Sequence, residues 1–495
     1  MPGENLIEAL ERFLLVHPRF LLSEFVREAA TDSDPEAVAS TVWPFLTGMS
    51  IVTEPRGRDL LLTRKTPQEP RCLDQAEQAG IEKFLRNPAV PQTFQEAVEQ
   101  YIEKKTGKSW NDPIVLERIR KAVVLQKDEY WKEREKRRIS YRKGYGVLGY
   151  LAYQAPGYMV QFEHLLYLLA GKGLLFPHMR VLDAGTGPGV VPIAIDDFLE
   201  RIGGCGADLF SVEQSGEFLE AFRFLTDTVA GRRGRVLVHA PLERDLRNIA
   251  IRDIPPSLDL IVFQNVLNEL SGLSPVEKGD LVAGFAKSLA LTGSILLIEP
   301  ADLSNSTELR KVVAAVEKAG LFLHAPCRFL WGGERCRPDH CWSFVEKAPI
   351  RPTRLMEALA TGLEGYRYRN TDIKFSYALL RKVPPPPPSA SPSSRRFARL
   401  STLQRHLNRR VNVAATVMSG NLGDSRTSVF LVCDGTSKKP VYAILHEYHK
   451  TPNNERLLSL PNGAAARFCS VLVRHNPRFD SYNLLVTRES RISDL

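Results

Sequence analysis

The sequence contains few cysteines and no long apolar run. Seven cysteines among 495 residues do not form the dense disulfide framework of a small secreted protein. No apolar stretch approaches the ~20 residues that a membrane-spanning helix needs, which argues against an integral membrane protein. The first dozen residues lack a basic, apolar leader and include Glu4, Glu8 and Glu11, so neither a secretory signal nor an organelle transit peptide is expected. These absences predict a cytoplasmic protein.

The composition is that of a globular chain with a modest basic excess. Hydrophobic residues make up 43% of the sequence, and the chain is too long for one core, so three or four domains are expected. The basic excess is concentrated in two blocks. Residues 116–144 hold eleven basic and five acidic side chains, and residues 381–410 hold eight basic and no acidic ones. Such blocks attract phosphate and favour a nucleic-acid partner, with a solvated helix face and a basic linker as the alternative for either block alone.

The pattern along the chain divides it into five segments. Residues 1–70 show three helical patterns and a short hairpin, typical of a winged-helix-like module or a helical cap. Residues 71–175 are mostly helical, and the spacing of their tyrosines favours core packing over base stacking. Residues 176–382 alternate β-rich runs with helical patterns, which predicts a mostly parallel, doubly wound α/β sheet. A linker rich in Pro, Ser and Arg at 383–410 precedes a last domain at 411–495.

The expected strands of the α/β domain are short apolar runs between the helical patterns. They lie at 180–183, 209–212, 236–239, 258–263, 294–298, 321–324 and 342–345, with a further strand at 375–380.

The last domain has five β-rich runs and one helical stretch before the fourth run. This is the order of an OB-fold, a β-barrel that binds single-stranded nucleic acid, and an SH3-like barrel is the competing fold. Five arginines are expected to contact phosphates: Arg467 and Arg474 in the barrel, and Arg395, Arg396 and Arg399 in the linker. Four aromatic residues are expected either to stack on bases or to fill the barrel core: Phe430, Tyr442, Phe468 and Tyr482.

The clearest motif is a glycine-rich loop after an apolar strand. The sequence runs from Val181 through Asp-Ala-Gly-Thr-Gly-Pro to Gly189, where a helical pattern begins. The glycines allow a tight turn and the close approach of a ligand to the backbone. A dinucleotide-binding fingerprint would need its third glycine at position 190, which is Val190, so a hydride-transfer cofactor is disfavoured. The loop resembles the cofactor-binding motif of class I S-adenosylmethionine (SAM)-dependent methyltransferases.

Two further positions agree with this resemblance. Glu213 ends the next strand, where that fold places a carboxylate for the ribose hydroxyls, and Leu242 follows the third strand, where the fold holds the adenine. The resemblance therefore implies SAM as the cofactor, bound by Asp183, Gly185, Gly187, Gly189, Glu213 and Leu242.

The segment after the fourth strand does not name a methyl acceptor. It lacks the Asn/Asp-Pro-Pro-aromatic motif of amino-group methyltransferases and the cysteine nucleophile of cytosine C5 methyltransferases. Methyl transfer depends largely on positioning, so these absences do not exclude activity. The polar groups expected near an acceptor, and the candidates for catalysis, are Asn265, Asn268 and Glu269.

Three of the seven cysteines lie within fifteen residues. Cys327, Cys336 and Cys341 have spacings that suit zinc or an iron–sulfur cluster, both of which prefer four ligands. The sequence offers four candidates for the fourth ligand: His340, which lies within the cluster, and His324, Cys433 and Cys469 outside it. Buried apolar cysteines are the alternative.

Several segments together resemble one family. They are Thr-Gly-Lys-Ser-Trp at 106–110, Gly-Tyr-Leu-Ala-Tyr at 149–153, the glycine-rich loop, Val-Leu-Asn-Glu-Leu at 266–270, the cysteine segment at 327–344 and Lys-Phe-Ser-Tyr at 374–377. Residues 75 to 382 resemble the methyltransferase-like assembly factor of the mitochondrial small ribosomal subunit and its archaeal and bacterial relatives. The resemblance implies a class I methyltransferase fold, association with the small ribosomal subunit, and a 4Fe–4S cluster for which Cys327, Cys336 and Cys341 match three of four ligands. Without a transit peptide, a prokaryotic cytosolic relative is expected.

Two functions follow from these observations. The first is a small-subunit factor in assembly or translation that binds rRNA and is built on a SAM-dependent methyltransferase fold. The alternative is an active SAM-dependent RNA methyltransferase.

Overall fold

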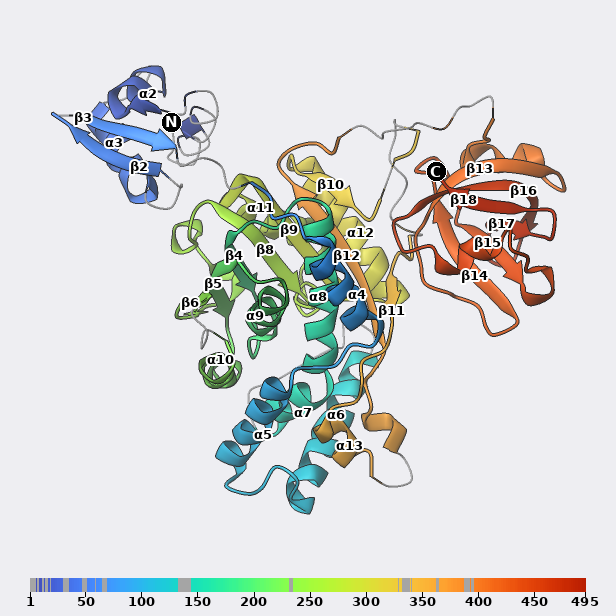
Figure 1. The fold of residues 1–495 in the computed structure, drawn as a ribbon, viewed down its shortest axis with the longest axis horizontal. Helices are drawn as coiled ribbons and strands as arrows, with labels where there is room; N and C mark the ends of the chain where they lie inside the picture. The colour runs from blue at the N-terminus through green and yellow to red at the C-terminus, as the bar shows by residue number, and fades with distance from the viewer. Residues whose placement is uncertain are drawn as a thin grey trace.

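The computed structural model describes most of the chain and divides it into three compact parts (Figure 1). The residues outside the description are 1–5, 7, 8, 11, 12, 14–16, 18, 30–34, 47–50, 58, 65–68, 132–143, 231–234, 328, 332–338, 340, 362–364, 387–391 and 393–395. The N-terminal part, the central α/β domain and the C-terminal barrel each have a hydrophobic core of their own. Among the described residues, no helix is both long and apolar enough to cross a bilayer.

The N-terminal part combines helices with a small antiparallel sheet. Helices α2 (Leu22–Ala29) and α3 (Pro35–Leu46) lie in the sequence between β1 (Arg19–Leu21) and the hairpin of β2 (Ile51–Arg56) and β3 (Asp59–Arg64). The three strands pair in the order β1-β3-β2. The helices bury Phe25 and Val42, which are at most 1% exposed, against this sheet.

Five helices precede the sheet of the central domain. They are α4 (Gln75–Arg86), α5 (Gln92–Thr106), α6 (Pro113–Trp131), α7 (Gly146–Tyr153) and α8 (Ala155–Gly171). A capping box between Asp74 and Glu77 starts α4, and Gly107, at a φ of 67°, ends α5 in the left-handed conformation. The tyrosines of α7 and α8 pack against the main core, as their spacing predicted.

The central domain is built on a nine-stranded sheet. Its main path runs β6 (Val236–Val238), β5 (Gly206–Glu213), β4 (His178–Ala184), β8 (Leu258–Gln264), β9 (Leu289–Pro300), β12 (Ile373–Arg381) and β10 (Phe322–Ala325). β7 (Leu242–Glu243) pairs with β5, and β11 (Val345–Lys347) pairs with β12. The strands from β6 to β9 are parallel, whereas β12 is antiparallel to β9. This strand order is the class I methyltransferase topology, so the predicted fold class is confirmed.

Helices cover both faces of this sheet (Figure 1). α8, α9 (Val190–Ile202) and α10 (Gly216–Thr228) contribute to the core on one face, and α11 (Pro275–Ala286) and α12 (Leu303–Lys318) to the core on the other. Because the central strands β4 and β8 are buried on both sides, their sequences read as continuous apolar runs. A short helix, α13 (Arg354–Leu359), packs against α6.

The strand predicted at 342–345 is wrong in its position. The observed strand, β11, begins only at Val345, and Phe344 before it contacts the barrel instead. The backbone N–H of Phe344 donates to the carbonyl of Met418 at 3.0 Å, and the carbonyl of Phe344 accepts from Asn462 Nδ2 at 3.0 Å. The apolar run therefore reflects burial between two domains rather than a place in the sheet.

The C-terminal domain is a closed five-stranded barrel with one added strand. Strands β13 (Arg410–Val417), β14 (Thr427–Cys433), β15 (Val441–His446), β17 (Ser481–Val486) and β16 (Ala465–Asn476) pair in that order, and β16 pairs back with β13. β15 and β17 are parallel, and β18 (Arg491–Asp494) adds to β16. This connectivity is that of an OB-fold, which decides between the two predicted barrels. The helical stretch before the fourth strand is a short 3-10 helix, η8 (Glu455–Ser459).

Part of the segment predicted as a linker belongs to the barrel. Leu400 and Leu403 lie in a 3-10 helix (η6, Leu400–His406) and are at most 1% exposed in the barrel core. The backbone N–H of Leu400 donates to Asp434 Oδ2 at 2.8 Å, which fixes this helix to the end of β14.

Candidate functional site

The glycine-rich loop connects the end of β4 to the start of α9. Gly185, Gly187 and Gly189 have φ values of 81°, 54° and 90°, which side chains rarely adopt. A Cβ at position 185 would lie 2.1 Å from Val266 Cγ2, so Gly185 is also required by close packing. The N–H groups of Gly185 and Thr186 donate to the carbonyl of Val212 on β5, at 2.8 and 3.0 Å. These two hydrogen bonds therefore hold the loop at the carboxyl ends of β4 and β5.

Two buried carboxylates lie at this edge of the sheet. Glu213 Oε2 accepts from the N–H of Gly187 at 3.0 Å, and its Oε1 accepts from Gln214 and Ser215, each at 2.8 Å. Burial raises the pKa of Glu213, while these backbone donors oppose the rise. Burial raises the pKa of Asp183 to about 7, and the negative charge of Glu213 adds to this rise. The sequence placed both residues beside the loop, and the structure brings them together there.

Leu242 lies on β7, directly opposite Val212 of β5. It is half-buried and packs against the core that contains Val212. Its position beside the last residues of β5 supplies an apolar contact next to Glu213.

The catalytic candidates follow β8, beside the glycine-rich loop. Asn265 has a φ of 56°, and its N–H donates to the carbonyl of Ile298 at 2.8 Å. Glu299, at the end of β9, accepts from the N–H groups of Leu267 and Asn268 at 2.9 and 3.2 Å. Glu299 therefore orients this turn, although the sequence did not single it out.

Several buried polar atoms in and around the loop have no hydrogen-bond partner. Among them are Thr186 Oγ1 in the loop itself, and Asp183 Oδ2, Asn265 Nδ2 and Asn268 Oδ1 beside it. Buried polar atoms are almost always paired in folded proteins, and unpaired ones in a cluster indicate a binding site. Together with the paired acid Glu213, this set fits a ligand that carries positive charge, hydroxyl groups and an amide or amine edge.

Two tyrosines complete the site, and their role in it was not predicted from the sequence. The rings of Tyr150 on α7 and Tyr158 on α8 meet edge to face, with centroids 6.0 Å apart. Burial raises the pKa of the Tyr150 phenol, and the charges of Glu269 and Asp183 add to the rise. Burial and the charges of Glu269 and Glu299 likewise raise the pKa of Tyr158. Both phenols remain protonated beside the acids of the site, so each carries an O–H donor group.

The cysteine cluster is described only in part. Cys327 and Cys341 are half-buried, whereas Cys336 and His340 lie outside the described residues. Within the described part of the chain, no group of three or more His, Cys, Asp or Glu residues is arranged to hold a metal ion. His324 Nε2 is bonded to the carbonyl of Val383 at 2.8 Å, and Cys469 lies on β16 opposite Arg491 of the barrel. The turn after Cys433, in contrast, packs on the cysteine segment, because a Cβ on Gly435 would lie 2.9 Å from Phe329 Cδ1.

The predicted phosphate contacts are exposed where they are described. Arg396 and Arg399 are exposed, Arg399 lies over the ring of Trp331 at 5.1 Å, and Arg395 lies outside the described residues. Arg467 and Arg474 both point outward from β16, because a bulge at Ser470 (φ 57°) shifts the alternation between them.

Base stacking by the predicted barrel aromatics is wrong for three of the four. Phe430, Phe468 and Tyr482 are at most 7% exposed and fill the barrel core, and Tyr442 is half-buried. Their alternating positions on the strands place them inward. The exposed aromatics are Tyr448 and Phe479, at 64% and 63%.

Tyr448 belongs to a basic cluster that follows β15. Its ring stacks on His446 with centroids 5.3 Å apart and meets His449 at 4.4 Å. Arg488 Nε donates to the carbonyl of Tyr448 at 3.1 Å. Burial and the positive charge of Arg488 lower the pKa of His449. No periodic signal in the sequence marks this cluster, because Tyr448 lies in a 3-10 helix of only three residues (η7, Glu447–His449).

Comparisons with known proteins agree with the fold but do not show a family for the whole chain. A family model described as "Domain of unknown function (DUF8157) C-terminal domain" matches residues 401–495. No curated protein matches the sequence.

Similar solved structures are methyltransferases of low identity. The magnesium protoporphyrin IX methyltransferase of Synechocystis PCC 6803 with bound SAM is 14% identical, with 60% of this chain and 100% of that one covered, at a TM-score of 0.29. A putative class I SAM-dependent methyltransferase from Listeria monocytogenes is 12% identical, covering 60% of this chain and 90% of that one, at 0.32. TrmN from Thermus thermophilus is 17% identical, covering 47% and 53%, at 0.27. The fold assignment therefore rests on the strand order, which defines a class I methyltransferase domain joined to an OB-type barrel.

Proposed function

We propose that this protein binds RNA through its barrel and SAM through its central domain, and that its RNA partner is the rRNA of the small ribosomal subunit. The observation that carries the RNA proposal is the exposed ring of Tyr448 beside the exposed Arg488, on a barrel with OB connectivity; the half-buried His446 and His449 pack against that ring. An exposed aromatic ring offers a stacking surface to a base, and the guanidinium of Arg488 attracts the phosphates.

RNA binding is tested by titrating a single-stranded RNA at several salt concentrations. Replacing Tyr448 with Ala should weaken binding about tenfold through lost stacking. Replacing Arg488 with Gln should weaken binding of all sequences and reduce the salt slope by about one. Phe479→Ala is the matched control, because Phe479 is equally exposed but lies before β17, at the opposite end of β15 from Tyr448. Binding that is independent of salt, or an effect of Phe479→Ala alone, would contradict the proposal.

The SAM proposal rests on the loop and on the three unpaired atoms beside it. Asp183, Asn265 and Asn268 would hold the polar groups of the ligand, and Glu213 would accept from its ribose hydroxyls. When bound, SAM supplies an electrophilic methyl group. Tyr150 and Tyr158 cover the site and, as protonated phenols, donate hydrogen bonds without competing as anions. Titration calorimetry with SAM tests this, and absence of binding to the folded wild type would refute it.

The association with the small ribosomal subunit is the finer part of the proposal. It is supported by the acid-free segment at 381–410, of which Arg396 and Arg399 are exposed beside the barrel. Sedimentation of native lysate should place the protein with free small subunits and not with translating ribosomes. Migration as a free protein would contradict this role.

Methyl transfer to RNA is the second candidate function. It is favoured by Glu269, whose charge acts on both tyrosines of the site, beside the unpaired Asn265 and Asn268. A modified nucleotide should then disappear from rRNA when Asp183 is replaced with Asn. An unchanged modification profile in a strain that lacks the protein would leave only the binding role.

A thiolate metal centre is proposed at the junction of the two domains. Cys327 and Cys341 would be joined by Cys433 from the barrel and by Cys336, the ligand predicted from the sequence. Thiolates are the ligands that zinc and iron–sulfur clusters share. Cys433→Ser should reduce bound zinc or iron, whereas Cys469→Ser, also half-buried in the barrel, should not. Equal metal content in both variants would refute this ligand set.

A further inference from the structure

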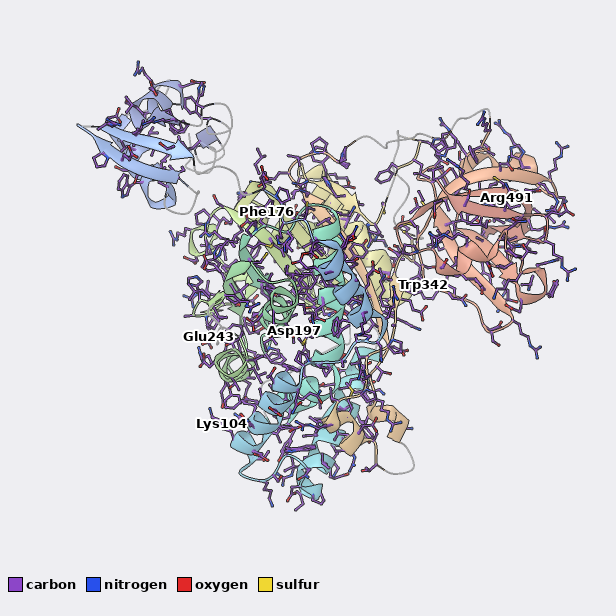
Figure 2. All side chains as sticks on the ribbon, in the orientation of Figure 1. Lys104, Phe176, Asp197, Glu243, Trp342 and Arg491 are labelled. Atoms are coloured by element: carbon purple, nitrogen blue, oxygen red, sulfur yellow. The ribbon has the colours of Figure 1, made fainter. Side chains whose placement is uncertain are left out.

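A cavity of about 300 Å³ lies between the central domain and the barrel, away from the glycine-rich loop. α8, β10, β11 and β12 form its walls on the side of the central domain, and the turn Pro461–Ala464 closes it from the barrel. Trp342, just before β11, lies on the same barrel-facing side of the central domain (Figure 2). The volume of the cavity is at the lower end of the range of small-molecule sites.

Four basic side chains line this cavity. His164 and Lys172 come from α8 and its C-terminal end, His324 from β10 and Lys347 from β11. None of the described residues that line the cavity is acidic. Basic groups from three separate elements therefore converge on one enclosed space.

No acid is among the described groups that shift the pKa of His164, His324 or Lys347. Burial lowers the pKa of His164 to about 3, and the nearby ammonium of Lys347 contributes to this shift. Burial lowers the pKa of Lys347 as well. Burial and the charges of Arg381 and Lys172 lower the pKa of His324, although its bond to the carbonyl of Val383 opposes the shift. The half-buried ammonium of Lys347, on which no described acid acts, is stabilised when an anion joins it.

Two polar atoms in the cavity wall lack a partner. His164 Nε2 and Asn462 Oδ1 are buried and make no hydrogen bond. Asn462 is fixed by its Nδ2, which donates to the carbonyl of Phe344 at 3.0 Å. The neighbouring Gly463 has a φ of 80°, and a Cβ there would meet the carbonyl of Pro326 at 3.4 Å. The turn is thus closely packed on the central domain while Asn462 Oδ1 remains unpaired.

We propose that this cavity binds a phosphate group, carried either by a free nucleotide or by the 5′ end of an RNA strand. The ammonium groups of Lys172 and Lys347 match the charge of a phosphate monoester, and His164 Nε2, when it carries the ring proton, can donate to one of its oxygens. Asn462 Oδ1 accepts from a hydroxyl of the attached sugar. The site is separate from the stacking cluster at Tyr448 and from the loop at Asp183.

The test compares ligands that differ only in the phosphate. Full-length protein is titrated calorimetrically with uridine monophosphate against uridine, and with a short RNA carrying a 5′-phosphate against the same RNA with a 5′-hydroxyl. A uridine base is used because adenine also fits the proposed SAM site. The phosphorylated member of at least one pair should bind about tenfold more tightly. Preference in the first pair identifies a free nucleotide, and preference in the second pair alone identifies an RNA end.

Variants connect this preference to the cavity. Lys172→Gln changes an exposed residue and so preserves the fold, and it should weaken binding of the phosphorylated ligand about tenfold, as should Lys347→Gln. Lys347→Arg should restore most of the affinity. Lys374→Gln is the matched control, because Lys374 lies next to Phe375 on β12 but pairs with Glu346 at 3.0 Å, outside the cavity.

Two results would overturn the proposal: no preference for phosphate in either pair, or an equal loss in Lys374→Gln. The salt-dependent binding of unphosphorylated RNA through Tyr448 should be unchanged in all of these variants. Failure of that binding in the wild type would count against the proposed function and not against this site.

Discussion

At the scale of single residues, position 185 is the most restrictive in the loop. Gly185→Ala combines a positive φ with a Cβ 2.1 Å from Val266 Cγ2, so the loop must shift. We expect SAM affinity to fall at least tenfold, measured by calorimetry. Gly187→Ala, which has a positive φ but open space around the new methyl group, should cost less.

A second substitution, at Val266, should relieve the clash made by Gly185→Ala. Val266→Ala removes Cγ2 and leaves the next contact, with Val266 Cβ, at 3.3 Å. The double variant should therefore recover part of the affinity lost in Gly185→Ala. If Val266→Ala gives no recovery, the loss comes from backbone strain alone.

Asp183 predicts a pH dependence of cofactor binding. Its carboxyl has a pKa of about 7, raised from 3.8, so its contribution to folding stability is greatest at low pH and falls as pH rises through 7. Ligand binding should follow the opposite course, because the ionised form attracts a cationic ligand. Affinity for SAM should rise about tenfold between pH 6 and pH 8, measured by calorimetry in matched buffers.

Asp183→Asn isolates this effect. Any pH dependence that remains in the variant belongs to the ligand or to Glu213. A wild-type profile no steeper than that of the variant would contradict the assignment to Asp183.

At the scale of elements, the bulge in β16 decides which side chains face outward. Ser470 holds a φ of 57°, and its N–H donates to the side-chain oxygen Asn412 Oδ1 at 2.9 Å, which holds this conformation without using the Ser470 side chain. Ser470→Gly should be neutral or stabilising, whereas Ser470→Val should lower the free energy of unfolding by about 1–2 kcal/mol. Denaturant unfolding measures both. Ser428→Val, in the regular strand β14, is the control and should have little effect.

The sequence predicted the elements best where one physical cause shaped the pattern. β4, β5 and β8 were recognisable because strands covered on both faces are continuously apolar. The run before Val345 was misassigned because burial against a second domain leaves the same apolar pattern as burial in a sheet. β7, with only two residues, is too short for any periodicity.

The residues of the candidate site also differ in how well the sequence predicted them. Asp183, Glu213 and the glycines were predictable because the loop requires them within a few consecutive residues. Tyr150, Tyr158 and Glu299 were not, because they reach the site from elements far apart in the sequence. Tyr448 was missed because it is exposed and lies in a 3-10 helix too short to show a periodic pattern.

At the scale of the whole molecule, the contact between barrel and central domain depends on few polar bonds. Asn462→Ala removes the donor to the carbonyl of Phe344 and should weaken the contact by about 1 kcal/mol. Hydrogen exchange should increase in the 341–347 segment while the strands of both domains stay protected. Asn421→Ala is the control, because Asn421 Oδ1 bonds only the N–H groups of Gly423 and Val429 within the barrel. Equal increases in both variants would contradict a specific contact.

The position of the barrel against the central domain also affects how readily separate molecules associate in a crowded solution. The edge strand of an open sheet has unpaired backbone N–H and carbonyl groups, which can pair with strands of other molecules. Beside β11, the N–H and the carbonyl of Phe344 are both occupied by the barrel, and a Cβ at Gly420 would lie 2.5 Å from Glu346 Oε2. The barrel thus shields this flank of the sheet from edge-to-edge association. A chain cut between the two domains would lose that protection, and its central fragment would be prone to aggregate even if every residue of its cofactor site were intact.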